Sequence, residues 1–225
     1  MSLVAKEPFH FYTRQNLTYL SGRKATNLIE LLSGIKEVPE MSIYHHTHHY
    51  LEQHEFLSPE PPNDFAYWIT NNLQDKLLGE EIASIDLREL LTLNEIRLKF
   101  IEAIEFSINE NSESLSRTAS PGSEFHFMSA RTFVFPTKYI ANSLGEFDEC
   151  LKKVSVHSIF YHIFEAKLFK KISNFCDWLS SSLNEQKLAE EFCKLDPYTQ
   201  TLENLRKMLI ELVENRLKEY SYGKA

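Results

Sequence analysis

Five of the nine histidines of this chain fall within ten positions, in the stretch "SIYHHTHHYLEQHEF" that covers residues 42–56. Clustered imidazoles could ligate a metal ion, relay protons or form a polar stripe on a helix. Residues three positions apart share one helix face, so we expect His46 and His49 to point to the same side. The stretch predicts a helix face with this chemistry, and the surrounding elements must decide which histidines matter.

The elements that position these histidines occur twice, because the chain is a tandem duplication. The first copy begins at Phe9 with "FHFYTRQNLTYL" and the second begins at Phe125 with "FHFMSARTFVFP". The match runs without a gap to "SIYHH" and "SIFYH", resumes at "NDFAYWITNNL" and "SNFCDWLSSSL", and ends with "TLNEIRLKFIE" and "TLENLRKMLIE". Self-similarity of this length indicates two copies of one structural unit. We expect residues kept in both copies to maintain the common framework.

Each copy predicts four helices. In the first copy we expect them to cover about residues 22–35, 39–54 and 63–85, and to continue from Thr92, where "TLNE" is a capping box. Asn63 is a good N-cap for the third helix, and Pro136 suits the first turn of the fifth. The sequence therefore predicts an all-α fold of two tandem four-helix repeats with approximate twofold pseudo-symmetry. Short extended arms containing Phe-His-Phe precede the first helix of each repeat.

The expected domains follow from the duplication. Helical repeat A covers residues 1–110 and helical repeat B covers residues 124–225. Between them, the segment "NSESLSRTASPGS" at 111–123 has the Ser-rich composition of a linker.

Composition excludes several classes of partner. The formal net charge is −8, whereas nucleic-acid binding requires a clustered basic surface, so we expect no nucleic acid as partner. We also expect no membrane, because no apolar stretch approaches the length of a bilayer span. The three cysteines lack a CxxC spacing, which favours reduced thiols in a cytoplasmic protein.

Only one histidine of the cluster is kept in the second copy, where His46 corresponds to His162. The second-copy segment "SIFYHIFEAKLF" is apolar nearly all round, as in a buried helix. A buried imidazole needs a hydrogen-bond partner, and Ser42 and Ser158 lie one helical turn earlier on the same face. One interpretation is therefore a core histidine at the centre of each repeat.

A metal centre is the alternative interpretation of the same residues. His46 and His49 share a helix face, and the second copy offers His162 and Glu165 at the same spacing. Such pairs supply two ligands each in helical-bundle metal sites, and imidazole with carboxylate suits Zn, Fe or Mn. Other helices would have to supply the remaining ligands.

The histidines that only the first copy carries form a third group of candidates. The loop "SPEPPND" next to the cluster is shortened in the second copy. An elaborated half is the natural place for a specific site, so we expect a ligand-binding surface there. Its candidate residues are His45, His48, His49, His54, Asn63 and Asp64.

The strings "SIYHHTHHYLEQHEFLSPEPPNDFAYW" and "LAEEFCKLDPYTQTLENLR" resemble an uncharacterised bacterial and archaeal family of unknown function over nearly the whole chain. The resemblance implies no settled activity, and it implies a link to carbohydrate-related glycosyltransferases. The sequence contains no nucleophile motif or phosphate loop, so whether it is an enzyme stays open. We predict a non-catalytic cytoplasmic protein that binds a small molecule or a protein. The alternatives are a metal-dependent enzyme or sensor that uses the histidines, and a self-associating scaffold.

Overall fold

The computed structural model describes residues 3–53, 63–87, 92–111, 113–166, 168, 173–196 and 200–222, with side chains as far as His48 in the first range. The chain divides into two compact units. Unit 1 contains the N-terminal residues as far as Gln15 and the described residues from Thr132 onward. Unit 2 contains the described residues from Asn16 to Arg131.

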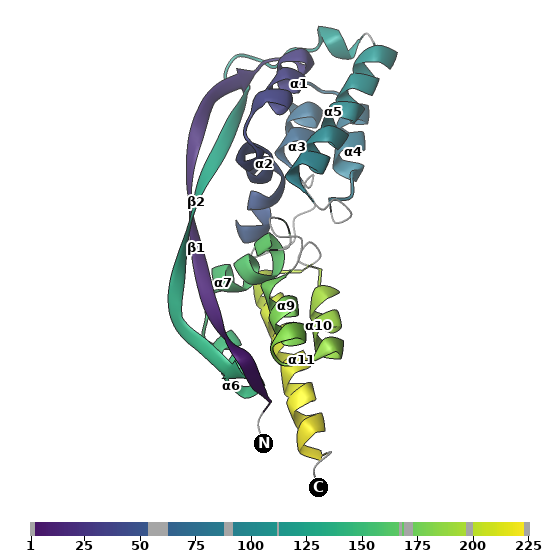
Figure 1. Ribbon diagram of the computed structural model, residues 1–225. Helices are drawn as coiled ribbons and strands as arrows, with labels where there is room; N and C mark the ends of the chain where they lie inside the picture. The colour runs from purple at the N-terminus through teal and green to yellow at the C-terminus, as the bar shows by residue number, and fades with distance from the viewer. Residues whose placement is uncertain are drawn as a thin grey trace. The chain divides into compact units, whose positions relative to one another are not determined.

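Two long strands make the fold mixed α/β, so the expectations of an all-α fold and a helical bundle were wrong. Strand β1 spans Val4–Ala25 and β2 spans Phe125–Ser143, and they pair as a two-stranded antiparallel sheet (Figure 1). Both segments are rich in the aromatic and β-branched residues that favour strands. Helical spacing begins only at Leu28 and Leu144. Pro136 therefore lies inside β2 rather than in a first helical turn, as Pro can at the unpaired edge of a sheet.

Unit 2 contains the helices of the first copy. They are α1 (Leu28–Glu37), α2 (Glu40–Gln53), α3 (Asp64–Asn71), α4 (Lys76–Ser84), α5 (Leu93–Glu110) and a short 3-10 helix, η1 (Ser114–Ser116). Helix α5 packs on α1, α2 and α4. The Thr92 capping box and the Asn63 N-cap are both present, so these two helix starts were predicted correctly.

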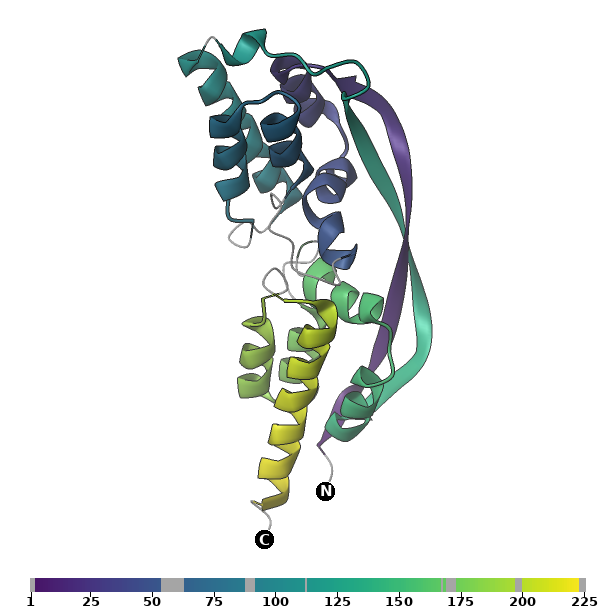
Figure 2. The same ribbon diagram turned by 180° about the vertical axis from the view of Figure 1, so that it is seen from behind.

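Unit 1 contains the helices of the second copy. They are α6 (Leu144–Leu151), α7 (Val156–Phe160), a π-helix η2 (Tyr161–Glu165), α9 (Asn174–Ser181), α10 (Gln186–Cys193) and α11 (Leu202–Tyr222). Figure 2 shows the long helix α11 beside α10, and α11 also packs on α6 and α7.

The expected third helix of each copy is two helices. Gln74, between α3 and α4, has a φ of 55°, and the equivalent Asn184, between α9 and α10, has a φ of 58°. This left-handed conformation ends the first helix of each pair. The hairpin of helices is then closed by packing between its two members.

The arm of each copy packs on the helices of the other copy. In unit 1, Phe9 of β1 lies against Phe147, Phe175 and Trp178. In unit 2, Phe125 of β2 lies against Phe65 and Trp68, the counterparts of two of these rings. Each compact unit is thus completed by a strand from the opposite repeat, and the core of each unit depends on this exchange.

The segment expected as a linker is packed onto unit 2 in its described part. The buried Ser114 hydroxyl donates to Asp75, and Ala119 N–H donates to the carbonyl of Thr26. Thr118 forms an isolated antiparallel bridge with Asn27. These bonds hold the chain between the two copies beside the end of β1.

A disulfide joins Cys176 of α9 to Cys193 of α10, whereas Cys150 is a buried free thiol. The expectation of three reduced thiols was therefore wrong for the first two. They do occupy small positions, because their first-copy counterparts are Ala66 and Ala83. No helix in the described part of the chain is long and apolar enough to cross a membrane.

Candidate functional site

His162, in the π-helix of unit 1, holds the first arm by its backbone. Tyr12 N–H donates to Nε2 of His162 at 2.8 Å, and the Ser158 hydroxyl donates to the carbonyl of Tyr12 at 2.7 Å. Both side chains are buried. Together they satisfy the two polar backbone groups of one strand residue.

His46 of α2 makes the same contacts in unit 2. Met128, the counterpart of Tyr12, donates its N–H to Nε2 of His46 at 2.9 Å, and the Ser42 hydroxyl donates to the carbonyl of Met128 at 2.6 Å. We call each His-Ser pair with its strand residue an arm clamp. The sequence interpretation of His46 and His162 as core histidines agrees with these contacts, although their partners are on an arm.

The arm clamp fixes the tautomer of each ring. Because Nε2 accepts a backbone N–H, the proton of the neutral imidazole must lie on Nδ1. In His46, Nδ1 lies 2.8 Å from Oδ2 of Asp64, a suitable acceptor. In His162, Nδ1 lies 3.0 Å from Nδ2 of Asn174, so the Asn174 amide has to be turned over for its oxygen to accept the same bond.

The two tryptophans add a second anchor for each arm. Trp178 Nε1–H donates to the carbonyl of Glu7 at 2.7 Å, and Trp68 Nε1–H donates to the carbonyl of Ser123 at 2.7 Å. Glu7 and Ser123 are equivalent positions of the two arms. The rings fill the core as expected, and the indole N–H groups keep the arms in register.

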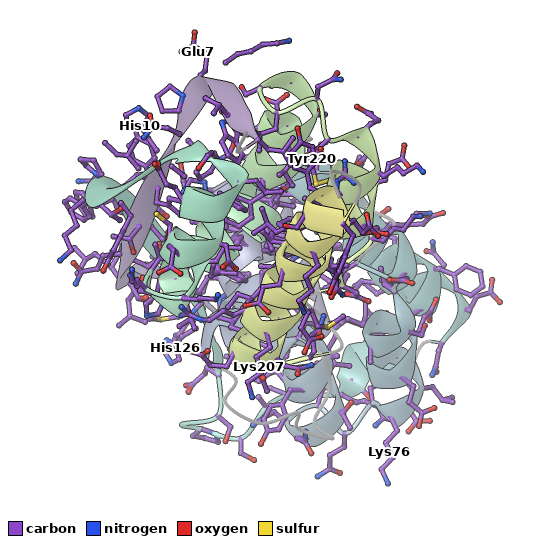
Figure 3. The ribbon with its side chains drawn as sticks, turned by 90° about the horizontal axis from the view of Figure 1, so that it is seen from below. Glu7, His10, Lys76, His126, Lys207 and Tyr220 are labelled. Carbon is purple, nitrogen blue, oxygen red and sulfur yellow. A yellow bond between two sulfur atoms is a disulfide. The ribbon has the colours of Figure 1, made fainter. Side chains whose placement is uncertain are left out.

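A cavity of about 460 Å³ lies beside the arm clamp of unit 1. Its walls come from the first arm, β2, the π-helix and α9. The lining residues are Phe9, His10, Tyr12, Val134, Tyr161, His162, Asn174, Asp177, Trp178, Ser181 and Ser182. His10 projects from β1 at the edge of the ribbon in Figure 3. The cavity thus combines aromatic surface with hydroxyl, amide and carboxylate groups.

The π-helix Tyr161–Glu165 forms one wall of this cavity, whereas the equivalent part of the first copy lies within the α-helix α2. Short π-helices are frequent at functional sites. Burial and the nearby Glu165 carboxylate raise the pKa of the Tyr161 phenol, which therefore stays a neutral donor at physiological pH. Glu165 itself forms a buried ion pair with Arg14 of the arm, with Nε and Oε2 2.6 Å apart.

The ligand candidates predicted in the first copy occupy different environments. His45 and Asp64 lie beside the arm clamp of unit 2, where Asn63 caps α3. They correspond to Tyr161 and Asn174, which line the cavity of unit 1. His48 is fully buried. The side chain of His49 and the whole of His54 lie outside the described residues, so their assignment stays a prediction.

The predicted metal candidates are divided between the two units. His46 belongs to unit 2, and His162 and Glu165 belong to unit 1. Both ring nitrogens of His46 face protein groups, and Glu165 faces Arg14. A ligand set of His46, His49, His162 and Glu165 stays a prediction, which in this geometry requires those contacts to be replaced.

Sequence reasoning missed the cavity residues of unit 1, above all His10, Tyr161, Asn174 and Asp177. The candidate ligand site was instead placed in the first copy, because the loop next to the histidines is longer there. Comparison of the copies did contain a signal, because each of Tyr161, Asn174 and Asp177 differs in type from its counterpart beside the same kept histidine and tryptophan.

Comparison with known proteins agrees with this architecture. The structure of OrfY from Thermoproteus tenax is similar, with a TM-score of 0.79 and 26% sequence identity, over 94% of this chain and 96% of that chain. No curated protein matches the chain. The family model of DUF5752, a family of unknown function, matches residues 6–214, and the chain therefore belongs to this family.

Proposed function

We propose that the protein is a non-catalytic binding protein for a small polar molecule, and that the cavity of unit 1 is its ligand site. The observation that carries this proposal is the lining, which places Trp178, Tyr12 and Tyr161 around hydrogen-bonding groups in a space of about 460 Å³. Ligand pockets commonly have volumes of roughly 300–1,000 Å³ and a mainly aromatic or apolar lining with a few polar groups.

The charges of the lining select among ligand classes. Asp177 contributes a carboxylate, and neither lysine nor arginine is among the lining residues in the described part of the chain. A phosphorylated or carboxylated ligand would meet the like charge of Asp177 without a lysine or arginine from these residues. The lining therefore favours a neutral polyhydroxylated molecule, which can stack an apolar face on an aromatic ring and bond its hydroxyls to Asp177 and Ser181.

Small carbohydrates have this combination of properties. The link to carbohydrate-related glycosyltransferases that the family resemblance implies is part of the proposal, and neutral sugars are the first ligands to test. A binding role, rather than catalysis, is supported by the use of His162. Its ring nitrogens hold the arm and Asn174, so the buried imidazole is engaged and does not serve as a general base.

Isothermal titration calorimetry with neutral mono- and disaccharides, and with the corresponding sugar phosphates, tests the proposal. The decisive variant is Asp177→Tyr, because tyrosine occupies the equivalent position 67, where it is half exposed. We expect binding of at least one neutral sugar, a loss of at least tenfold in affinity in this variant, and weaker binding of the phosphates.

The matched control is Tyr67→Phe, which alters the equivalent surface of unit 2 and should leave the affinity unchanged. Thermal unfolding of both variants checks that they fold. Failure of the whole sugar panel to bind, or equal affinity of wild type and Asp177→Tyr, would contradict the proposal. So would a preference for the phosphorylated sugars.

A further inference from the structure

A second cluster of functional side chains lies in unit 2, at the position that corresponds to the cavity of unit 1. His45, His46 and Asp64 each offer one ligand atom, and these atoms lie within 4.8 Å of one another. We propose that these three residues form a binding site for a divalent transition metal of the zinc class. This inference does not rest on the sugar-binding proposal, which concerns the other unit.

Two helices position the cluster. His45 and His46 are neighbours on α2, with ring centroids 5.1 Å apart and perpendicular planes. Asp64 is the first residue of α3, whose start is fixed by the Asn63 cap. The His46 side chain is only 3% exposed, whereas the Asp64 side chain is 59% exposed. His46 therefore forms the buried side of the cluster. The side with Asp64 faces solvent, where water could complete the coordination.

The donor set suits zinc. Zinc takes imidazole nitrogen and carboxylate oxygen at about 2.0–2.2 Å, and three protein ligands with one open position are typical of its reactive sites. Ligand atoms of a tetrahedral zinc lie roughly 3.3–3.5 Å apart by this geometry. The three ligand atoms lie within 4.8 Å of one another, and His46 Nδ1 is already 2.8 Å from Asp64 Oδ2, so changes of about an ångström in the side-chain positions bring the set to this spacing.

The second copy serves as an internal control. At the three equivalent positions it has Tyr161, His162 and Asn174. A neutral phenol and an amide are poor zinc ligands beside imidazole and carboxylate. The duplicated framework therefore carries a metal-ligating set in unit 2 alone among these equivalent positions, and we expect one metal ion for each chain.

Metal binding at this site should weaken the arm clamp of unit 2. His46 Nδ1 now carries a proton and faces Asp64, while Nε2 accepts Met128 N–H. A metal on Nδ1 leaves the neutral ring with its proton on Nε2, so two donors then face each other. The bond from Met128 breaks without net proton release. Occupancy of the metal site is thereby coupled to loosening of the second arm.

Calorimetric titration of the chain, purified without a histidine tag, with Zn²⁺ tests the site. The comparison variant is the double substitution His45→Tyr with Asp64→Asn, which installs the residues that the second copy carries. We expect one Zn²⁺ for each wild-type chain and at least tenfold weaker binding to the variant. The variant should fold, since the same residues flank the arm clamp of unit 1, and circular dichroism checks this.

Hydrogen exchange read by NMR tests the coupling. On addition of Zn²⁺, the Met128 amide should exchange faster in the wild type, whereas the Tyr12 amide of the other arm clamp should not change. Wild-type protein that does not bind Zn²⁺, or equal binding by the double variant, overturns the metal site. Binding with an unchanged Met128 amide overturns the coupling. Because sugars are absent from these titrations, the result is independent of the ligand proposed for unit 1.

Discussion

Acid should destabilise the protein through His48, a fully buried histidine of α2. Its ring stacks on Tyr44 with centroids 5.6 Å apart, and Nδ1 lies 2.6 Å from Oγ1 of Thr47. The Thr47 hydroxyl already donates to the carbonyl of Ile43, so it accepts the Nδ1–H of a neutral His48. Burial lowers the pKa of His48 from 6.5 to about 3.

The sign of the effect follows from linkage. The unfolded chain binds a proton at His48 as the pH falls below about 6.5, whereas the folded chain does not until the pH approaches 3. The stability that the neutral ring contributes is therefore present above the unfolded pKa and is lost as the pH falls through this window. With these two pKa values, the free energy of unfolding should drop by about 2 kcal/mol between pH 7 and pH 5.

The second copy supplies the control substitution. Phe164 occupies the position equivalent to His48 and packs on Phe160 in a tilted arrangement, with centroids 5.0 Å apart. The variant His48→Phe should therefore fold and lose only this titration. Urea unfolding at both pH values gives the measurement, and we expect the wild type to lose about 2 kcal/mol more than the variant.

Comparison of the two proteins cancels the remaining titrating groups, provided that they do not interact with His48. The second variant, Thr47→Ile with His48→Phe, installs both residues that the second copy carries at these positions. It also removes the Thr47 hydroxyl, which in the single variant has lost the Nδ1–H donor of His48. Equal losses of stability in the wild type and both variants would refute the reasoning, because His48 would then have to gain its proton as readily in the folded chain.

Three further variants test the construction of unit 1. Arg14→Met should cost about 3–5 kcal/mol in urea unfolding, because it leaves Glu165 as an unpaired buried charge; a loss below about 1 kcal/mol would contradict the buried pair. Replacing Cys176 and Cys193 by alanine, as in the first copy, should lower the unfolding free energy by about 3 kcal/mol, and an unchanged melting temperature under oxidising conditions would argue against the disulfide. Ser158→Ala should cost about 1 kcal/mol and speed proteolysis of the first arm, because it leaves a partly buried carbonyl of the arm without its donor; unaltered cleavage would contradict the arm clamp.

The sequence predicted the framework best where both copies repeat the same local chemistry. The Thr92 capping box and the Asn63 cap are local hydrogen-bond patterns, so a few neighbouring residues are sufficient to predict them. The kept pair of Ser42 and His46 indicated a buried polar contact by helical spacing alone. The identity of its partner required the fold, because the partner is a backbone group of an arm distant in sequence.

The strands were underestimated because a helical pattern downstream was extended too far toward the N-terminus. Residues from Leu28 carry the helical spacing, whereas Ala25 is the last residue of β1, where it is fully buried. The exchange of arms was beyond prediction for a different reason. The two arms are similar in sequence, and each arm clamp binds a backbone amide and carbonyl, which every non-proline residue offers. Neither the arm sequences nor the backbone contacts therefore indicate on which copy's helices an arm packs.

The same comparison of copies explains where specific chemistry can arise in this fold. Each arm clamp needs a histidine, a serine and a phenylalanine ring that packs on the histidine. Both units contain all three residues. The ring nitrogen that faces away from the arm is free of this constraint, so its partner can change from Asn174 to Asp64 without loss of the arm. The neighbouring position changes with it, from Tyr161 to His45. A single framework can therefore accommodate both the cavity that we propose for a neutral ligand in unit 1 and the metal-ligating set that we propose in unit 2, and substitutions that exchange these residues between copies should separate the two roles.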